Sequence, residues 1–429
     1  MGAKFGYGHS LNRGVPARGL TPLMADMLAG AGLAPRQIGA AADFTRDEYW
    51  SGGSRYALEN WPGWSYSRTG TRYSDSADGS LTSFAANVPR RTDKGLAVDA
   101  GATNVLTYSQ DFSNAAWVGS SAGTGSDPVV TANAGVAPDG TMTADQIVFD
   151  RGAGDTSSDS STMTQAPTTS AGTYTGGLWL KAATGDDVGK EILLRHVYVG
   201  AFTVLTLTAD WVRHSVTETQ FANNFQILNR GTYSTGNSVS LLAWQAQLVS
   251  GSVAVPDIPT TSASASAGAD VASVDLGVSG GLWTNLGNLD PSNGFTIVCN
   301  FNLPYIPTNQ PYVFSVGTDV SNRIGFYINS IGNIRTWGIG GGASYTTSLG
   351  AALLGSNKVA LAFEPGVELR GSANGGAGVG DLSGSTPTSY TSLIFGARHG
   401  QAPIGNMYIE RNAVIEGALT DAQLQVLST

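Results

Sequence analysis

Short apolar runs of strand length, separated by turn residues, limit most strongly what this chain can fold into. Between about residues 100 and 270 these runs include GGLWLKA, EILLRHVYV and AFTVLTLT. From about residue 271 onward the same pattern returns in FTIVCNFNL, PYVFSVG and RIGFYIN. Regular spacing of strand-like runs, with no helical segments between them, is typical of antiparallel sandwiches. The sequence therefore predicts an all-β protein built from antiparallel β-sandwiches.

The composition agrees with this fold class and argues against several others. Of the 429 residues, 57 are glycine and only 13% are charged, which argues against charge-driven disorder and against a charge-rich helical bundle. The formal net charge is −9, with 23 Lys and Arg against 32 Asp and Glu, and the basic residues form no run longer than Arg90-Arg91. No cationic track for phosphates is visible, so nucleic acid is not expected as a partner.

The length suggests two or three domains, and composition shifts place their boundaries. In PDIPTTSASASAGADV, residues 256–271, Pro and small residues replace the strand pattern, which marks a boundary. Before residue 100, aromatic residues are spaced by Gly, Ser and Asp, and SADG at 76–79 predicts a hairpin turn. We therefore expect an N-terminal attachment segment (1–43), an irregular β leader (44–100), a first sandwich (101–270) and a second sandwich (271–429).

The strongest helix signal in the N-terminal part is LTPLMADMLAGAG, residues 20–32, with Thr21 as N-cap and Pro22 at the first helical position. A helix of two or three turns is marginal alone in water, so its apolar face is expected to dock on something else. That partner is either the chain itself or a neighbouring subunit, and the second alternative makes the helix an attachment point. The candidate attachment residues on this face are Leu20, Leu23, Met24, Met27 and Leu28.

Cys299 is the single cysteine and lies in the apolar run FTIVCNFNL, so we interpret it as a buried hydrophobic residue and not as a catalytic thiol. A chain without a disulfide framework suits folding in a reducing cytoplasm. The first residues lack the apolar run of a secretion signal, and nowhere do 18 consecutive apolar residues occur. We therefore expect a soluble protein, made without a signal peptide and not held in a membrane.

Several blocks of the first sandwich resemble a known kind of module. They are TNVLTYSQDFSNAAW (103–117), VTANAGVAPDGTMTADQIV (130–148), GGLWLKAAT (176–184), DWVRHSVTET (210–219) and the stretch that runs from LLAWQAQLV to residue 274. In this order they resemble a carbohydrate-binding-module-like sandwich found in tail-fibre and related surface proteins of phages and prophages. The preceding residues 66–104 look like the leader that commonly precedes this module. Its opening aromatics, Tyr108, Phe112 and Trp117, are expected to pack where the chain begins the sandwich.

Two blocks of the second sandwich, NKVALAFEPGVELRGSANG (357–375) and SLIFGARHGQAPIGNMYIERNAVIEGALTDAQLQVL (392–427), are similar to concanavalin A-like, laminin-G-type domains. In that family a short terminal helix follows a Gly-bounded strand, and here it begins at Leu419-Thr420-Asp421-Ala422. Thr420 and Gln423 also form the sequence pattern of a capping box. The resemblances imply two jelly-roll or concanavalin A-like sandwiches after a short helical anchor.

The resemblances imply a virion-surface protein of a bacteriophage, a prophage or a phage-like gene transfer agent, as a tail fibre, tail tip or head spike. Such a protein is expected to bind host capsule or other cell-surface polysaccharide, and to contact other virion proteins through its N-terminal segment. Several copies on one particle would strengthen a weak single-site affinity. We therefore expect a homo-oligomer, a trimer first and a fivefold arrangement at a capsid vertex. A purely structural decoration or connector without glycan binding is the alternative.

A sugar site combines flat aromatic faces with amides, carboxylates or arginine, gathered in one concave place. Trp179, Trp211 and Trp244 lie in strand-like runs, so we interpret them as structural. Binding residues tend to lie on loops held by a rigid scaffold, so we expect the better candidates to be aromatic residues on loops. The candidate carbohydrate-binding residues are Tyr305, Tyr312, Asn333, Trp337, Tyr345, Arg398 and His399.

Metal binding and catalysis find little support in the sequence. The four histidines are scattered without the spacing of zinc ligands. Calcium stays open, because DRGAGDTSSDSS at 150–161 offers oxygen ligands, although a solvated loop is the simpler interpretation. A capsule depolymerase needs two carboxylates across the scissile bond, and Glu364 and Glu368 flank a turn instead of sharing a helical face. We therefore expect no required cofactor and no enzyme activity, with the depolymerase as a further alternative.

Overall fold

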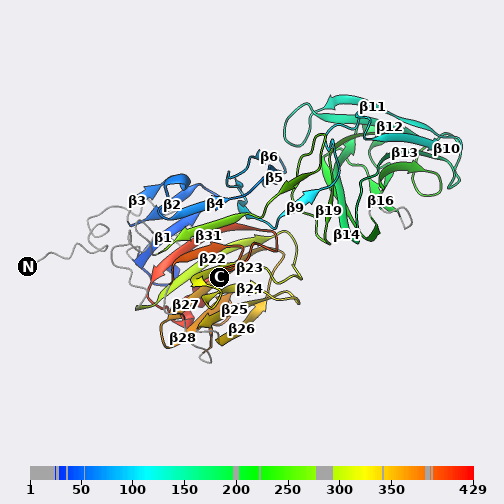
Figure 1. The fold of residues 1–429 in the computed structure, drawn as a ribbon. Coiled ribbons are helices and arrows are strands. Elements are labelled where there is room, and N and C mark those ends of the chain that lie inside the picture. The colour runs from blue at the N-terminus through cyan, green and yellow to red at the C-terminus, as the bar shows by residue number, and fades with distance from the viewer. Residues whose placement is uncertain are drawn as a thin grey trace, which may run out of the picture. The chain divides into compact units, whose positions relative to one another are not determined.

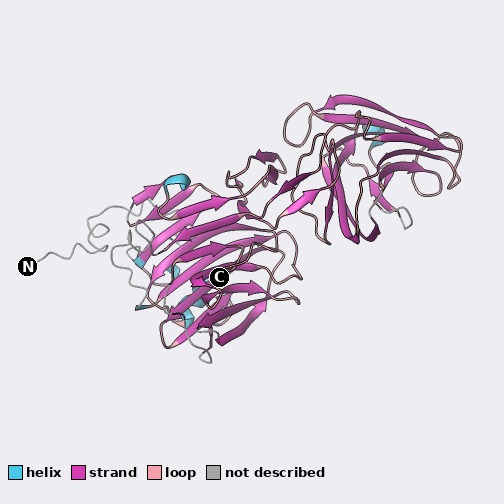
Figure 2. Ribbon diagram, in the orientation of Figure 1, coloured by secondary structure: helices cyan, strands magenta, loops and turns pink. Residues whose placement is uncertain are grey.

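The computed structural model describes residues 25, 29–34, 37–52, 54–196, 202–221, 224–276, 293–340, 343–381, 387 and 390–429. Within these ranges nearly every regular element is a β-strand, and the strands pair antiparallel throughout (Figure 2). The all-β prediction is therefore confirmed. Among the described helices, none has the length and apolar character needed to cross a bilayer.

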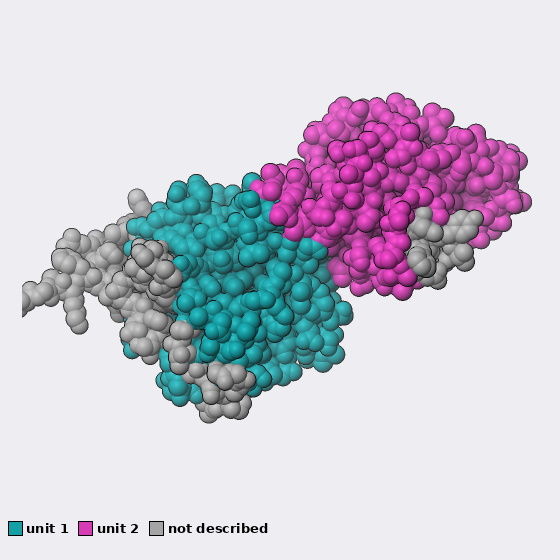
Figure 3. Space-filling view, in the orientation of Figure 1, with its two compact units in different colours: residues 1–68, 87–101, 269–429 teal, residues 69–86, 102–268 magenta. Residues whose placement is uncertain are grey.

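The chain divides into two compact units (Figure 3). Each unit has its own hydrophobic core. Unit 1 comprises residues 1–68, 87–101 and 269–429, and unit 2 comprises residues 69–86 and 102–268. The chain thus leaves unit 1 at two places and returns to it twice. The predicted boundary near residue 270 lies close to the last of these crossings.

The first sheet of unit 1 has ten strands, with the order β29-β28-β27-β22-β31-β1-β2-β3, and with β8 paired to β31 and β7 paired to β8 (Figure 1). Its strands are β1 (Ile38–Asp43), β2 (Glu48–Ser51), β3 (Ser54–Tyr56), β7 (Arg91–Thr92), β8 (Gly95–Val98), β22 (Phe295–Leu303), β27 (Gly355–Glu364), β28 (Glu368–Ala373), β29 (Val379–Asp381) and β31 (Met407–Glu416). A short 3-10 turn, Leu58–Asn60, follows β3.

The second sheet of unit 1 has seven strands, with the order β26-β25-β24-β23-β30-β21-β4. Its strands are β4 (Trp64–Ser67), β21 (Val271–Asp275), β23 (Tyr312–Asp319), β24 (Asn322–Ile328), β25 (Asn333–Gly340), β26 (Ala343–Ala351) and β30 (Ser392–Phe395). This seven-stranded sheet carries the candidate site.

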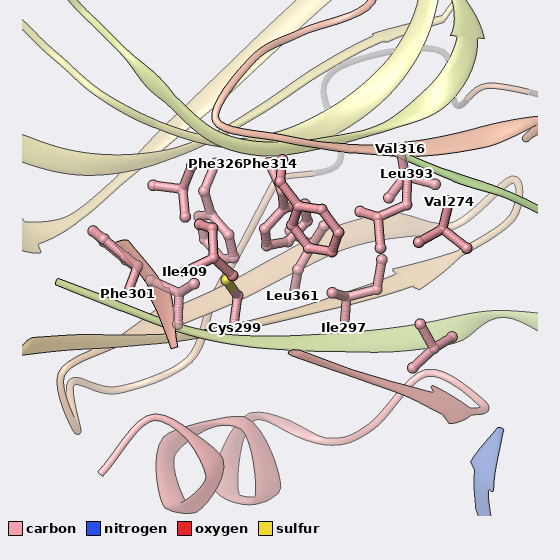
Figure 4. Packing of buried hydrophobic residues seen from close by; sticks show 14 of the residues in the cluster. Val274, Ile297, Cys299, Phe301, Phe314, Val316, Phe326, Leu361, Leu393 and Ile409 are labelled. Carbon is pink, nitrogen blue, oxygen red and sulfur yellow. The ribbon is translucent and has the colours of Figure 1, made fainter. Parts of the chain in front are cut away.

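The core of unit 1 lies between these two sheets (Figure 4). Phe314 and Phe326 of the seven-stranded sheet pack toward Ile297, Cys299 and Phe301 of β22, and all five are fully buried. Alternate residues of β22 face opposite ways, so Val298 instead joins a smaller cluster on the other side of the ten-stranded sheet. Two packed faces explain why almost every residue of this strand is buried.

The predicted β leader, residues 44–100, does not form a region of its own. In the leader, β8 pairs with β31 and β4 pairs with β21, so these strands complete both sheets of unit 1. β1, which lies at the end of the predicted attachment segment 1–43, also pairs with β31. Arg411 fixes the register from the far end of the chain, because its Nε donates to Asp43 Oδ2 at 2.9 Å. The segment at 72–84 instead belongs to unit 2, where β5 (Arg72–Asp75) and β6 (Leu81–Phe84) form the predicted hairpin around Gly79, whose φ is +82°.

The C-terminal helix α4 (Asp421–Leu427) begins with the predicted capping box. Leu424 and Leu427 pack against the outer side of the ten-stranded sheet, together with Ala31 and Leu33. Gln423 Nε2 also donates to the Ala31 backbone oxygen at 3.3 Å. The candidate attachment residues Leu20, Leu23, Met24, Met27 and Leu28 all lie outside the described residues, so their predicted role stays a prediction.

Unit 2 is a second antiparallel sandwich, with one core between two five-stranded sheets. One sheet contains β10 (Val118–Ala122), β13 (Ser160–Gln165), β18 (Phe225–Arg230), β15 (Glu191–Arg195) and β16 (Thr203–Thr206). The other contains β11 (Ser126–Gly135), β12 (Ala144–Asp150), β19 (Ser238–Ser250), β14 (Ala171–Ala182) and β17 (Val212–Phe221). A small ladder of β9 (Ala102–Asn104) and β20 (Ala265–Ala267) and a 3-10 turn, Gly185–Asp187, complete it.

The opening aromatics of unit 2 pack as predicted. Phe112 and Trp117 are buried, and their ring centroids lie 4.7 Å apart in the core. The Trp117 indole Nε1 donates to the backbone oxygen of Tyr108 at 3.0 Å, which closes the turn between them. Asp145 accepts the Phe112 amide at 2.7 Å and thereby ties this turn to β12. These aromatics stabilise the start of the sandwich and do not form a binding loop.

Cys299 provides a direct probe of unit 1. Its side chain is fully buried, and burial, helped by the negative charge of Glu410, raises the pKa of its thiol. Because only the thiolate of an exposed cysteine reacts, we expect native protein to react with a thiol reagent at least about 1,000-fold more slowly than unfolded protein. Absorbance of the released thiolate of the reagent measures both rates. Similar rates in native and unfolded protein would contradict the burial.

Candidate functional site

One face of the seven-stranded sheet points away from the core and gathers aromatic and basic side chains. In β24, Ile324, Phe326 and Ile328 point into the core, so Arg323 and Tyr327 lie on the opposite face. Residues paired across an antiparallel ladder share a face, and the register therefore adds further residues to the outward face. These are Tyr312 and Arg335 opposite Tyr327, Trp337 and Ser315 opposite Gly325, and Gly317 and Ile339 opposite Arg323.

Three outward aromatic rings lie against one another. The Tyr312 ring centroid is 5.7 Å from that of Tyr327 and 5.5 Å from that of Trp337, in the second case edge to face. Such pairs are favourable because the positive edge of one ring meets the negative face of the other. Tyr312 and Tyr327 stay half-buried, whereas Trp337 is 8% exposed and forms the floor of the group.

Two arginines cover this floor. The guanidinium of Arg323 lies 4.6 Å from the Trp337 ring centroid, and that of Arg398 lies 5.1 Å from the Tyr312 ring and 5.9 Å from the Trp337 ring. Arg398 comes from the loop after β30, and its Nη1 donates to the Tyr312 hydroxyl at 3.0 Å. Its Nε donates to Oε1 of Gln401. These contacts hold Arg398 at the surface with its guanidinium group close to two aromatic rings.

A pocket of about 500 Å³ opens beside Tyr312 and Arg398. Its volume lies within the usual range of small-molecule sites, which is about 300–1,000 Å³. The lining combines one aromatic ring, one guanidinium, three side-chain amides and the apolar side chains of an alanine and an isoleucine. The residues are Asn309, Gln310, Tyr312, Arg398, Gln401, Ala402 and Ile404.

His399 lies behind the arginines as a buried support. Its Nδ1 is 2.9 Å from Ser315 Oγ and its Nε2 is 2.8 Å from Ser392 Oγ, so both ring nitrogens are hydrogen-bonded to the seven-stranded sheet. Its backbone oxygen accepts a hydrogen bond from Arg323 Nη1. His399 therefore fixes the loop that presents Arg398 and does not itself face a ligand, since it is only 5% exposed.

The buried imidazole should titrate far below the usual histidine range. Burial, and next the charge of Arg323, lower the pKa of His399 to about 4. Between pH 6.5 and 4 the unfolded chain then binds more protons than the folded chain at this position, so the free energy of unfolding falls as the pH is lowered. We expect this loss to be about 2–3 kcal/mol larger in the native sequence than in His399→Gln, measured by denaturant unfolding at pH 7 and pH 4. Equal pH slopes in the two proteins would contradict it.

The structure brings together four of the seven candidate sugar-binding residues: Tyr312, Trp337, Arg398 and His399. Asn333 is the first residue of β25, directly after the turn that begins at Asn329, and it lies on the same outward face of the sheet. Tyr305 lies in the loop after β22, half-buried, and burial raises its pKa to about 12. Tyr305 makes none of the ring contacts that are described for Tyr312, Tyr327 and Trp337.

Tyr345 lies in the core and not on the binding face. It is 4% exposed and packs in the main core cluster of unit 1, where Gly338 on the neighbouring strand leaves room for its ring. The expectation that these candidates lie on loops is also wrong for Tyr312, Asn333, Trp337 and Tyr345, which all lie in strands. Rigid strands position the rings, while the loops supply Arg398 and the amides.

Sequence reasoning missed Arg323, Tyr327, Arg335 and the pocket amides. A signal existed in RIGFYIN, where Arg323, Gly325 and Tyr327 alternate with apolar residues. This period of two shows that they share a face, but it does not show which strands lie beside them. The grouping with Tyr312 and Trp337 depends on the ladder register alone.

The described residues offer little to metal or acid–base chemistry. Within the described ranges no three His, Cys, Asp or Glu side chains gather in a way that could hold a metal ion. In the stretch 150–161, Asp159 uses its carboxylate to accept hydrogen bonds from Thr124 and Thr156, and these bonds lower its pKa. Glu364 and Glu368 lie opposite each other across the predicted turn, and Glu368 pairs with Arg370 at 2.9 Å.

The strand tryptophans of unit 2 are structural, as predicted. Trp244 is fully buried in a cluster against which Trp179 and Trp211 pack. The Trp179 indole donates to Asp257 Oδ2 at 2.7 Å and the Trp211 indole to the Val136 backbone oxygen at 3.1 Å. These polar contacts satisfy the indole N–H groups within unit 2.

No protein-family model matches the sequence, and no curated protein sequence matches it. One similar solved structure is the CBM40 module of the Ruminococcus gnavus IT-sialidase bound to α2,6-sialyllactose, with 21% sequence identity. The match covers 37% of this chain and 92% of that chain, with a TM-score of 0.30. Trypanosoma rangeli sialidase matches at 14% identity, with 37% of this chain and 25% of that chain covered. The receptor-binding domain of a botulinum neurotoxin C/D mosaic serotype matches at 10% identity, over 37% and 40% of the two chains. The last two also have TM-scores of 0.30, and similarity at this level says nothing about what the site binds.

Proposed function

We propose that this chain is a carbohydrate-binding protein that holds a glycan on the outward face of the seven-stranded sheet. The observation that carries the proposal is the pocket of about 500 Å³ in which the Tyr312 ring, Arg398 and three amides converge. A pyranose ring presents an apolar face to an aromatic ring and hydroxyl groups to amides and guanidinium, and this site offers both contacts in one place.

The surrounding structure supports a preformed site. Tyr312 and Trp337 are held by strand pairing, and Arg398 is held by Tyr312 and Gln401. A site that is ordered before the ligand arrives loses little conformational freedom on binding. The mode of action that we propose is binding of the glycan without cleavage.

The retention of full-length protein on immobilised polysaccharides tests this function. Capsule, lipopolysaccharide and purified polysaccharides are presented on beads, and the retained protein is compared with that on uncoated beads. We expect retention on at least one glycan and release by the matching soluble oligosaccharide. Failure of folded protein to bind any of them would overturn the proposal.

We further propose that the protein acts as an adhesin on the surface of a phage or phage-like particle, where it binds the host cell. Sequence blocks that resemble phage and prophage surface proteins support this role. Attachment to other virion proteins through residues 1–43, assembly into a homo-oligomer and location on the virion belong to the same proposal. Mass measurement by light scattering tests the oligomer, and a monomer at micromolar concentration would contradict it.

A structural or connector role without glycan binding is the competing function. The strand pairing within unit 1 decides which variant can distinguish it from the adhesin role. Deletion of residues 275–429 is unsuitable as a test, because β1 and β8 would lose β31 and β21 would lose β30. The variant Tyr312→Ala changes the site and leaves those pairings in place. Particles that carry this variant should assemble normally and adsorb poorly if the protein is an adhesin. Normal adsorption would favour the structural role.

A capsule depolymerase is the remaining alternative, and digestion of the polysaccharide tests it. We expect unchanged viscosity and no new reducing ends after long incubation of the capsule with the protein. A steady increase in reducing ends would replace the binding proposal with an enzymatic one.

A further inference from the structure

Arg323 is a buried cation that forms no ion pair with any described residue. It is 5% exposed, its Nη1 donates to the His399 backbone oxygen, and its Nε has no hydrogen-bond partner among the described residues. Burying a charge without a counter-charge is costly, and the buried Arg90 of the same unit shows the ordinary solution by pairing with Asp99 and Asp270. The protein therefore holds, close to Arg398, a buried positive charge that has no ion-pair partner among the described residues.

Arg398 adds a second positive charge at the same place. Both guanidinium groups lie over the Trp337 ring, and burial, followed by the charge of Arg398, lowers the pKa of Arg323. Arg398 uses Nε and Nη1 on Gln401 and Tyr312, while its Nη2 has no hydrogen-bond partner in the described parts of the chain. Two like charges that repel each other would both be stabilised by one anion between or above them.

The nearby acidic residue, Asp319, offsets part of this charge but forms no ion pair with Arg323. Its carboxylate acts on Arg323 from a distance, while its Oδ1 accepts the Ser321 amide at 2.7 Å and an Asn322 side-chain N–H at 3.2 Å within its own turn. The described lining of the pocket contains Arg398 and three amides but no carboxylate. The charged group in this lining is therefore a cation, which favours an anionic group on the ligand.

We propose that the site selects acidic glycans, and that a sugar carboxylate binds Arg398 while Arg323 contributes its charge from below. This inference rests on the proposed glycan binding and names the substrate class of that site. The Arg398 guanidinium can donate a charge-assisted hydrogen bond to a carboxylate through Nη2, which makes Arg398 the specificity-determining residue. Arg323 acts through charge and through the position of the Trp337 ring, so it is a positioning residue.

Matched oligosaccharides separate this inference from the proposed function. Affinities of the full chain are measured by calorimetry for oligogalacturonate and for the same oligomer after reduction of its carboxyl groups to alcohols. A second pair, sialyllactose and lactose, extends the test to another acidic sugar. We expect at least about 10-fold tighter binding of the acidic member in one pair, and a preference that weakens as salt is added.

Three substitutions at two arginines, with one control, locate the charge that is recognised. Arg398→Gln should remove the preference for the acidic member, and Arg398→Lys should restore part of it. Arg323→Gln should reduce the preference and also weaken its salt dependence, which loss of packing alone would not do. Arg55→Gln removes a 54% exposed arginine of β3 that pairs with Glu48, and it should change nothing.

Each result of these binding measurements leads to a different conclusion. Equal binding of both members of each pair overturns the acidic specificity and leaves glycan binding intact. Stronger binding of a sulfated oligosaccharide than of every carboxylated one also overturns the inference, because the class of anion would be wrong. No binding of any acidic or neutral oligosaccharide overturns the proposed function itself.

Discussion

Replacing Asp270 with Asn is expected to destabilise unit 1 by about 3–5 kcal/mol. Asp270 is fully buried, and its carboxylate pairs with Arg90 at 2.5 Å and with Arg68 at 3.5 Å. It also accepts the Tyr66 hydroxyl and, at 2.9 Å, the backbone amide of Asp99. The substitution leaves the arginines with buried positive charge that the neutral asparagine side chain cannot balance. Asp270 also directly precedes β21, which pairs with β30, the strand that carries Ser392.

Denaturant unfolding measures this loss of stability, and Cys299 makes the measurement specific for unit 1. Because the only cysteine lies in the core of unit 1, its reaction with a thiol reagent reports unfolding of unit 1 and not of unit 2. Glu48→Gln is the matched control, since it removes a surface pair with Arg55 and should cost less than about 1 kcal/mol. Similar small losses in both variants would show that the buried charges contribute little.

Replacing Tyr312 with Ala is expected to weaken glycan affinity about 30-fold, which corresponds to about 2 kcal/mol. The Tyr312 ring is the accessible aromatic surface of the pocket, and its hydroxyl also holds Arg398. Calorimetry with the best-binding oligosaccharide measures the loss. Tyr312→Phe keeps the ring and removes one hydrogen bond, so it should weaken affinity at most about 10-fold.

The matched control for this prediction is an exposed aromatic residue of unit 2. Tyr233 is 43% exposed, its ring lies 5.2 Å from that of Phe202, and Arg230 lies 5.8 Å from its ring centroid. It therefore resembles Tyr312 chemically but lies in the other unit. Tyr233→Ala should leave affinity unchanged, and a loss equal to that of Tyr312→Ala would move the site away from the seven-stranded sheet.

Local patterns predicted the elements of this fold well, because they depend on neighbouring residues. The apolar run around Cys299 forms a buried strand, Thr420 and Gln423 form the capping box, and the hairpin at 76–79 turns where expected. Strand partners could not be predicted in the same way. The pairing of Asp43 with Arg411 joins residues at opposite ends of the sequence, and no local period reveals it.

The same distinction applies to the candidate site. Tyr312, Trp337, Arg398 and His399 were identified by residue type, and the structure gathers them. Tyr345 was indistinguishable by type, but the ladder places it opposite Gly338 on the inward face. Arg323 was missed because a charged residue in an alternating strand ordinarily faces solvent, whereas the loop at 398–399 covers it here.

Amide hydrogen exchange of the full chain, with and without a saturating bound oligosaccharide, tests the central claim most directly. The claim predicts that the glycan protects residues 309–312, 323–327, 335–337 and 398–402, which form the outward face and its pocket. Protection confined to unit 2 or to the ten-stranded sheet, with these segments unchanged, would contradict it.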